Sequence, residues 1–330
     1  MRLAGSGMYR PRRHSGLPML GEHIACKRRR LTVQNLENIL VVVTREVDCT
    51  LVLEKAQILA AAANANTFVV RVIYDDVVDS GIPRAEDAQR LKTFIMEAEE
   101  TYLEDLVKNC NAKFQNIELA TVWNKRQWEG VKDVAEDIGA DLIIKVANLE
   151  ARSQEVIHTP DDWNLLRNAK CPVMLVKPQA WESVPAIVAA VDILDEAHQE
   201  MNTAILEEAD SLAKALGGIL HIVNAYPLFE PWVGELGAGY NYEKIKDDIE
   251  SELQESILGI AKAGGIDFSM LQIREGKPSM VIRDVVDECS ADLVVMGTVG
   301  RSGVAGLVIG NTSEAVLHVV NTDVVTLRTK

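Results

Sequence analysis

The sequence predicts an α/β fold made of two tandem, doubly wound, mainly parallel five-stranded sheets with helices on both faces. Three observations point to it: an internal repeat, a regular alternation of apolar strand-like runs with helix-like segments, and glycines that mark helix ends. Parallel neighbouring strands need crossover connections, which helices normally supply. Short, continuous apolar strands are also what a sheet covered on both faces requires.

The repeat appears when the chain is compared with itself. Residues 139–145 (Gly-Ala-Asp-Leu-Ile-Ile-Lys) align with residues 290–296 (Ser-Ala-Asp-Leu-Val-Val-Met). Nearer the front, residues 38–44 align with residues 186–192. We therefore expect four segments: a basic leader at 1–34, either disordered or upstream of the true start, a first domain at 35–178, a linker at 179–184 and a second domain at 185–330.

The second copy shows the alternation most clearly. An apolar, β-branched run at 186–191 predicts a strand, and apolar residues at helical spacing then end at Gly217-Gly218, as in a helix with a glycine stop. Because each copy ends in an apolar strand that would be an exposed edge, we expect strands 173–176 and 324–327 to lie near each other. The remaining elements are expected as strand 219–225, helix 242–263, strand 269–274, helix 279–289, strand 292–296, a glycine-rich loop and helix 311–319.

Composition excludes several classes of protein. The chain of 330 residues carries a net charge of −15, although eight of its basic residues fall in the first 31 positions. A folded body that acidic repels nucleic acid phosphates and anionic lipids, so neither is expected as a partner. The five cysteines lack a metal-binding or disulfide spacing, which indicates a cytoplasmic protein without a bound metal. No apolar run approaches the length of a membrane span.

The segment after strand 292–296 is the strongest candidate for a ligand site. Asn311 is expected to cap the following helix, with Glu314 three residues later completing a capping box. Free amides at a helix start favour phosphate, and Arg301 is the only basic side chain in the loop. The alternative is a flexible crossover that binds nothing. Five glycines remove Cβ atoms from the path of an approaching anion: Gly297, Gly300, Gly303, Gly306 and Gly310.

Asp192 ends the first strand of the same copy. In an open α/β sheet, ligands bind at the carboxyl ends of strands where the strand order reverses. This carboxylate can therefore accept hydrogen bonds from a nucleoside whose phosphates the loop holds; the alternative is that it caps a helix or turn.

The first copy lacks the features of this candidate site. We therefore expect no anion cradle there, and we expect His158 and Trp163 to pack rather than to react. Asp192, Gly297, Gly300 and Gly310 are replaced by Thr44, Val146, Leu149 and Thr159.

The spacing Gly297-x2-Gly300-x9-Gly310, with an aspartate after the first strand, resembles the ATP-binding type of the universal stress protein family, in which Ser or Thr follows the last glycine. Here Asn311 stands at that place and Thr312 follows it. The resemblance spans about residues 35–330 and implies a cytoplasmic stress-response protein that binds an adenine nucleotide such as ATP, with Asp192 and the apolar Ile222 at the nucleoside end. The implied contact residues are Asp192, Ile222, Gly297, Gly300, Arg301, Gly303, Gly310, Asn311 and Thr312.

Three functions remain open at this point. The first is a regulatory protein whose second domain binds an adenine nucleotide or another phosphorylated ligand and thereby alters its association with other proteins. The second is a nucleotide-free scaffold or carrier that takes an apolar ligand near Phe229, Trp232 and Tyr240. The third is a slow ATP hydrolase or phosphotransferase. Catalysis is the least expected, because no acid, lysine or histidine is placed by sequence to activate a nucleophile.

Overall fold

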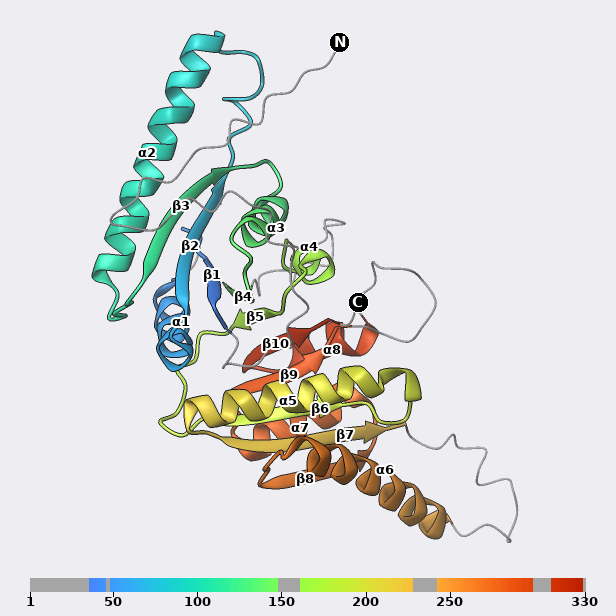
Figure 1. Ribbon diagram of the computed structural model, residues 1–330. Helices are drawn as coiled ribbons and strands as arrows, with labels where there is room; N and C mark the ends of the chain where they lie inside the picture. Colours follow the sequence, from blue (N-terminus) through green and yellow to red (C-terminus); the bar gives the residue numbers. More distant parts are fainter. Residues whose placement is uncertain (1–35, 46–47, 148–160, 228–241, 299–309, 329–330) are drawn as a thin grey trace.

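The apolar runs of both copies form the strands of one continuous sheet in the computed structural model (Figure 1). The structure describes residues 36–45, 48–147, 161–227, 242–298 and 310–328. The first copy comprises β1 (Asn38–Val42), α1 (Thr50–Ala63), β2 (Asn66–Ile73), α2 (Ala85–Asn109), β3 (Ile117–Trp123), α3 (Gln127–Asp137), β4 (Leu142–Val146), α4 (Asp161–Asn168) and β5 (Val173–Val176). The second comprises β6 (Ala186–Val191), the short helix η2 (Glu196–His198), α5 (Gln199–Leu216), β7 (Ile219–Tyr226), α6 (Tyr242–Gly264), β8 (Met270–Glu275), α7 (Pro278–Cys289), β9 (Leu293–Gly297), α8 (Asn311–Val319) and β10 (Asp323–Leu327).

The strand order is β3-β2-β1-β4-β5-β10-β9-β6-β7-β8. Neighbouring strands within each copy are parallel, whereas β5 and β10 pair antiparallel, with Val324 opposite Leu175. The doubly wound, mainly parallel α/β class is therefore confirmed, and so is the adjacency of the two terminal strands. Their pairing covers two apolar edges with each other, so that the two five-stranded units form a ten-stranded sheet.

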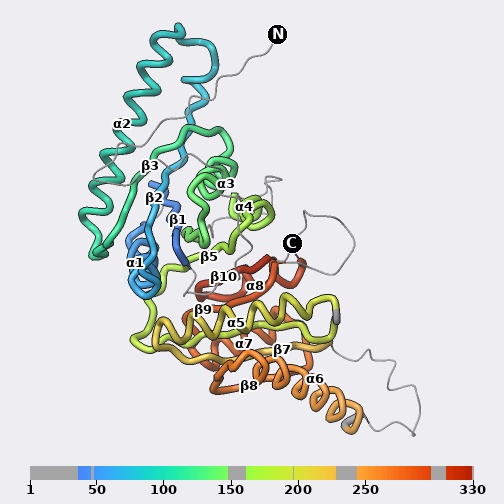
Figure 2. Tube along the Cα trace, in the orientation of Figure 1, coloured from blue at the N-terminus to red at the C-terminus, as the bar shows by residue number. Residues whose placement is uncertain are grey.

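Helices cover both faces of the sheet. One core cluster packs beneath α1, α2, α5 and α6, and a second packs beneath α3, α4, α7 and α8. Strand β1 illustrates why the strands are continuously apolar, because Ile39 and Val41 belong to the first cluster while Leu40 and Val42 belong to the second. The tube trace shows the two copies side by side, with α1 and α5 close to the junction (Figure 2).

Two glycines end α5 for different reasons. Gly217 adopts the left-handed conformation at φ 62°, which confirms the glycine stop. Gly218 allows a close approach, because a Cβ atom there would lie 2.4 Å from the Pro185 carbonyl oxygen. The Ile219 N–H donates to the same carbonyl oxygen at 2.8 Å, which holds the start of β7 beside the start of β6.

The repeated Ala-Asp-Leu sequence has the same role in both copies. The Asp292 carboxylate accepts hydrogen bonds from the backbone N–H groups of Glu182 at 3.0 Å and Ala186 at 2.9 Å. In the first copy, Asp141 accepts from the N–H groups of Glu37 and Asn38 at 2.8 and 3.0 Å. Each aspartate therefore anchors the chain as it enters the first strand of its copy.

A buried carboxylate joins the two copies and the segment between them. Asp323 at the start of β10 is 1% exposed and accepts hydrogen bonds from Lys55 Nζ of α1 at 2.6 Å, the Lys177 N–H at 2.7 Å and Trp181 Nε1 at 2.8 Å. Burial raises the pKa of Asp323, and the neighbouring Lys55 ammonium opposes that shift. One donor from α1 and two from the segment between the copies compensate the cost of burying this charge. The shared carboxylate therefore fixes the position of the two copies relative to each other.

The opposite face of the sheet carries a second contact between the copies. The ring of Trp163 in α4 lies 5.5 Å from the ring of His318 in α8, centroid to centroid. Lys177 Nζ donates to the Leu317 carbonyl oxygen at 3.3 Å, and Thr326 Oγ1 donates to the Val173 carbonyl oxygen at 3.0 Å. Trp163 therefore packs at the junction, as expected from the sequence.

Glu208 occupies in α5 the position that Lys55 occupies in α1, counted back from the left-handed residue that follows each helix. It is 1% exposed, and its Oε2 atom has no hydrogen-bond partner. Burial raises the pKa of Glu208 well above its ordinary value of 4.5. The folded state therefore favours the protonated side chain.

We expect this burial to make stability depend on pH. Below pH 4.5 Glu208 is protonated in both the folded and the unfolded state, and the pKa shift costs the folded state nothing. As the pH rises toward the folded-state pKa, Glu208 ionises in the unfolded state first, so the free energy of unfolding falls. Glu208→Gln should therefore gain stability relative to the parent between pH 5 and pH 8, measured by urea denaturation. The exposed Glu200→Gln serves as control. A stability difference between Glu208→Gln and the parent that is the same at pH 5 and at pH 8 would contradict the assignment.

Candidate functional site

The candidate site lies at the carboxyl ends of β6 and β9, where the strand order of the second copy reverses. These two strands are neighbours, with Ala190 opposite Met296. The chain leaves β6 toward α5 on one face and leaves β9 toward α8 on the other. This arrangement forms the switch point at which open α/β sheets bind ligands. The structure places Asp192 directly after β6 and Gly297 at the end of β9.

Two buried asparagines hold the backbone at Asp192. Asn202 of α5 accepts a hydrogen bond from the Asp192 N–H at 2.9 Å and donates to its carbonyl oxygen at 2.7 Å. Asn224, near the end of β7, accepts from the Ile193 N–H at 3.1 Å. Asn202 and Asn224 are 2% and 0% exposed, so their positions are fixed by the core. They therefore fix the direction in which the Asp192 side chain leaves the sheet.

The Asp192 carboxylate itself is accessible. Its side chain is 47% exposed, and Oδ2 lies 3.1 Å from Nδ1 of His198 in η2. A carboxylate that is held by one neighbour and open to solvent can accept hydrogen bonds from hydroxyl groups of a ligand. The arrangement supplies an acceptor at the switch point, as the sequence predicts.

The glycine-rich segment starts and ends at fixed points. The Gly310 N–H donates to the Thr298 carbonyl oxygen at 2.9 Å, and the Thr298 N–H donates to the Leu327 carbonyl oxygen of β10 at 2.8 Å. Ser313 Oγ donates to the Gly297 carbonyl oxygen at 2.8 Å. The two ends of the segment are thus held together beside β9. Gly300, Arg301, Gly303 and Gly306 lie outside the described residues.

Gly297 provides room for a neighbouring side chain. A Cβ atom at this position would lie 3.0 Å from Cγ and 3.1 Å from Sδ of Met201, in the first turns of α5. Met201 is 7% exposed and belongs to the core beneath α5. The absence of a side chain at Gly297 therefore lets the start of α5 approach the end of β9.

The start of α8 differs from the expected capping box. Asn311 is the first residue of the helix, and the N-cap is Gly310, with φ −63°, ψ 142° and no side-chain cap. The prediction that Asn311 caps the helix is wrong, because the preceding glycine takes the extended N-cap conformation. Asn311 and Thr312 are exposed in the first turn. Their side chains face solvent at the helix start, where backbone N–H groups favour an anion.

Ile222 does not reach the carboxyl edge. It pairs with Ala189 in the sheet, is 0% exposed and packs in the core beneath α5. Asn224, two residues later and opposite Val191, occupies the edge instead. The described site therefore brings together Asp192, Gly297, Gly310, Asn311 and Thr312, and leaves Ile222 below it.

The first copy fills the corresponding position with an ion pair. Lys145 Nζ of β4 lies 2.6 Å from Asp162 Oδ1 of α4, and both residues are 6% exposed. They correspond to Met296 and Ser313 of the second copy under the repeat alignment. A buried lysine and aspartate thus stand where Ser313 contacts the strand end in the second copy. Leu149, His158 and Thr159 lie outside the described residues.

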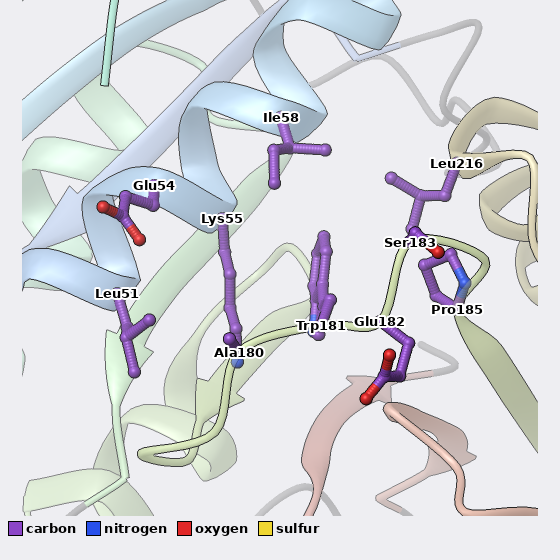
Figure 3. A pocket seen from close by; sticks show the side chains of 10 residues that line it. All are labelled: Leu51, Glu54, Lys55, Ile58, Ala180, Trp181, Glu182, Ser183, Pro185 and Leu216. Atoms are coloured by element: carbon purple, nitrogen blue, oxygen red, sulfur yellow. The ribbon is translucent and has the colours of Figure 1, made fainter. Parts of the chain in front are cut away.

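Two cavities lie elsewhere in the described residues. One, of about 390 Å³, lies between α1 and the segment that joins the copies, with Trp181 between Lys55 and Ser183 (Figure 3). The other, of about 310 Å³, is lined by residues of β2, α2 and β3. Neither is lined by Asp192 or Gly297.

Several residues of the site were not predicted. His198, Asn202 and Ser313 contact the backbone or side chain of the predicted positions Asp192 and Gly297, and Asn224 contacts the backbone of the next residue, Ile193. The available signal was a polar residue on an otherwise apolar face, since Asn202 precedes Ile205 by one helical turn and Asn224 interrupts an apolar strand.

Among the described residues, no cluster of three or more His, Cys, Asp or Glu could hold a metal ion. No helix of that part of the chain has the length and apolar character needed to span a membrane.

Comparison with known proteins agrees with this architecture. The profile of the Universal stress protein family matches residues 35–177 and 185–328. Universal stress protein E of Escherichia coli K12 is 30% identical over 215 residues, covering 64% of this chain and 68% of that protein. The universal stress protein E homolog of Haemophilus influenzae is 32% identical over 206 residues, covering 61% and 67%.

Solved structures extend the similarity to nearly the whole chain. A Pseudomonas aeruginosa protein described as functionally unknown aligns with a TM-score of 0.65 at 25% identity, covering 90% of this chain and 94% of that one. A universal stress protein from Archaeoglobus fulgidus shares the fold with a TM-score of 0.58 at 17% identity, covering 89% and 99%. With two family matches in tandem over most of its length, the chain belongs to the universal stress protein family.

Proposed function

We propose that the chain is a cytoplasmic stress-response regulator that binds an adenine nucleotide, or another phosphorylated ligand, in its second copy. The observation that carries the proposal is the fixed, accessible Asp192 carboxylate at the switch point, beside the closed ends of the glycine-rich segment. We place the working units at residues 35–178 and 185–330, with 179–184 as the linker. ATP is the first ligand to test, because the motif of the second copy resembles that of ATP-binding family members.

The chemistry of the site assigns the two ends of such a ligand. Ribose hydroxyl groups donate to Asp192, and the phosphates approach the start of α8, where Asn311 and Thr312 are exposed. Ser313 is already used by the Gly297 carbonyl oxygen. In this assignment, the hydroxyl left for a phosphate is that of Thr312. The site supplies binding groups for both ends of a nucleotide.

The first copy acts as the partner without a nucleotide in this proposal. The Lys145–Asp162 pair is buried at the position corresponding to the site, and Thr44 replaces the aspartate. A ligand phosphate would have to displace a compensated buried ion pair, which costs more than binding at an open helix start. We therefore assign one nucleotide to each chain.

Native mass spectrometry of the freshly purified full chain tests the class of ligand. We expect a co-purified phosphorylated ligand, or one added ATP per chain after desalting and incubation. The carrier alternative predicts an apolar ligand instead, and its proposed residues Phe229, Trp232 and Tyr240 lie outside the described part of the chain. An apolar ligand together with no ATP adduct would contradict the proposal. ATP turnover lost in Asp192→Ala would identify the chain as a hydrolase instead.

A further inference from the structure

The cavity of about 310 Å³ in the first copy contains a buried arginine. It lies at the carboxyl ends of β2 and β3, and α2 packs against both strands (Figure 1). Arg71 of β2 lines this cavity and is 8% exposed. A guanidinium group carries five N–H donors and is not deprotonated in proteins. Burying it costs free energy unless its charge is balanced and its donors are hydrogen-bonded.

Only part of the Arg71 guanidinium is paired within the described residues. Its Nε atom forms an ion pair with Oε2 of Glu99 in α2, and its Cζ atom lies 5.5 Å from the ring centroid of Tyr102. Within the part of the chain that the structure describes, its two terminal nitrogens, with four donors between them, make no hydrogen bond. Buried donors are nearly always bonded to protein, water or a ligand. These four are therefore available to an acceptor in the cavity.

The side chains that contact Arg71 leave a positive charge unbalanced. Glu99 Oε2 is shared, because Nε of Arg45 lies 3.1 Å from the same oxygen. Two guanidinium groups thus face one carboxylate, whose side chain is 12% exposed. Asp75 also lines the cavity, but its Oδ1 atom accepts hydrogen bonds from two N–H groups of the turn that follows β2. The cavity therefore favours an acceptor with one negative charge, whereas a dianion would be repelled by Glu99 and Asp75.

Apolar and aromatic side chains form much of the remaining wall. Ile95, Tyr74 and Trp123 line it, and the two rings are tilted against each other with centroids 5.7 Å apart. Asp79, which accepts a hydrogen bond from Trp123 Nε1, and Asp76 are exposed, so solvent screens their charges. An apolar wall with a few convergent polar groups is typical of a small-molecule site.

Arg71 has a different role from its counterpart in the second copy. The pairing of β1 with β2 matches that of β6 with β7, and it places Arg71 where the second copy has Asn224. Asn224 holds the backbone after β6. After β1, Cys49 contacts the Thr44 N–H at 3.4 Å and its carbonyl oxygen at 3.5 Å through Sγ. The chain there is held without the Arg71 donors, which leaves them for a ligand.

We infer that this cavity binds a small organic monocarboxylate with an apolar ring. The carboxylate accepts two parallel hydrogen bonds from the terminal nitrogens of Arg71, the geometry that a guanidinium matches best. The ring lies against Ile95 and Trp123, while Glu99 keeps the guanidinium in position. The inference does not depend on nucleotide binding, because none of these residues belongs to the candidate site of the second copy.

Fluorine NMR of 4-fluorobenzoate with the full chain tests the assignment. We expect a dissociation constant of about 1 mM or below, and binding at least about 10-fold weaker for the neutral isostere 4-fluorobenzamide. Arg71→Met keeps the apolar stem and leaves Glu99 paired with Arg45, and it should weaken 4-fluorobenzoate binding at least about 10-fold. Arg274→Met, which removes the partner of Glu288 in the second copy, is the matched control and should change nothing.

Four results would overturn the inference. They are 4-fluorobenzoate binding no tighter than 4-fluorobenzamide, equal binding by Arg71→Met and the parent, an equal loss in Arg274→Met, and displacement of 4-fluorobenzoate more readily by phenyl phosphate than by benzoate. The last would mean that the cavity prefers a dianion. Thermal melting checks that the variants fold. If Arg71→Met does not, Arg71→Lys keeps the charge but loses the paired donors, and it should weaken binding at least about 3-fold.

Discussion

Asp323→Ala is expected to lower the free energy of unfolding by about 3–5 kcal/mol, because it leaves a buried ammonium without its partner. The carboxylate is 1% exposed and lies 2.6 Å from Lys55 Nζ, whose side chain is 3% exposed. Removing it also leaves the N–H groups of Lys177 and Trp181 without their acceptor. Since these donors come from α1 and from the segment between the copies, the variant should loosen the junction as well. Urea denaturation followed by far-UV circular dichroism measures the loss.

Two further variants make this prediction specific. Asp76→Ala removes the partner of Lys125 in a pair with both side chains mostly exposed, and it should leave the denaturation midpoint nearly unchanged. Lys55→Met/Asp323→Leu removes both buried charges together and should recover part of the stability lost in Asp323→Ala. If Asp323→Ala were as mild as Asp76→Ala, the buried network would not be what holds the copies together.

The fold was predictable because its signals are local or repeated. The apolar run at 186–191 became β6, and the glycines after α5 ended that helix, since both depend on nearby residues. The pairing of β5 with β10 followed from two apolar edges that needed cover. The network at Asp323 could not be predicted, because the sequence does not state that Lys55 approaches a residue so distant along the chain. Contacts of that kind depend on how the two copies dock.

The candidate site was predictable only in outline. The aspartate after the first strand, Gly297 at the end of β9 and Gly310 before α8 lie where the motif places them. The capping prediction for Asn311 failed because Gly310, which also suits an N-cap, takes the extended conformation before the helix. Ile222 lies below the edge because β7 continues past it: Asn224 is opposite Val191, the last residue of β6, and the strand ends at Tyr226. The two asparagines that hold Asp192 come from different elements, so only the folded chain brings them together.

Asp192→Ala is expected to weaken ATP binding about 10- to 100-fold, because a charge-assisted hydrogen bond is worth about 1.5–3 kcal/mol. The backbone at this position should stay in place, since Asn202 and Asn224 contact main-chain atoms rather than the carboxylate. The carboxylate contacts His198 at 3.1 Å and is 47% exposed, so its loss should hardly change the melting temperature. Weaker binding at unchanged stability distinguishes a ligand contact from a structural one.

Thr44→Ala is the matched control for Asp192→Ala. Thr44 follows β1 at the position that corresponds to Asp192 in the repeat. Since the first copy is assigned no nucleotide, this variant should bind ATP as tightly as the parent. A loss in Thr44→Ala equal to that in Asp192→Ala would place the ligand between the copies or in the first one.

The most direct measurement is a calorimetric titration of ATP into the full chain, the Asp192→Ala variant and the Thr44→Ala variant at equal concentrations. We expect one site per chain in the parent and in Thr44→Ala, and the weaker binding given above in Asp192→Ala. Equal affinity of Asp192→Ala and the parent, or a parent that binds two ATP molecules per chain, would contradict a nucleotide site confined to the second copy.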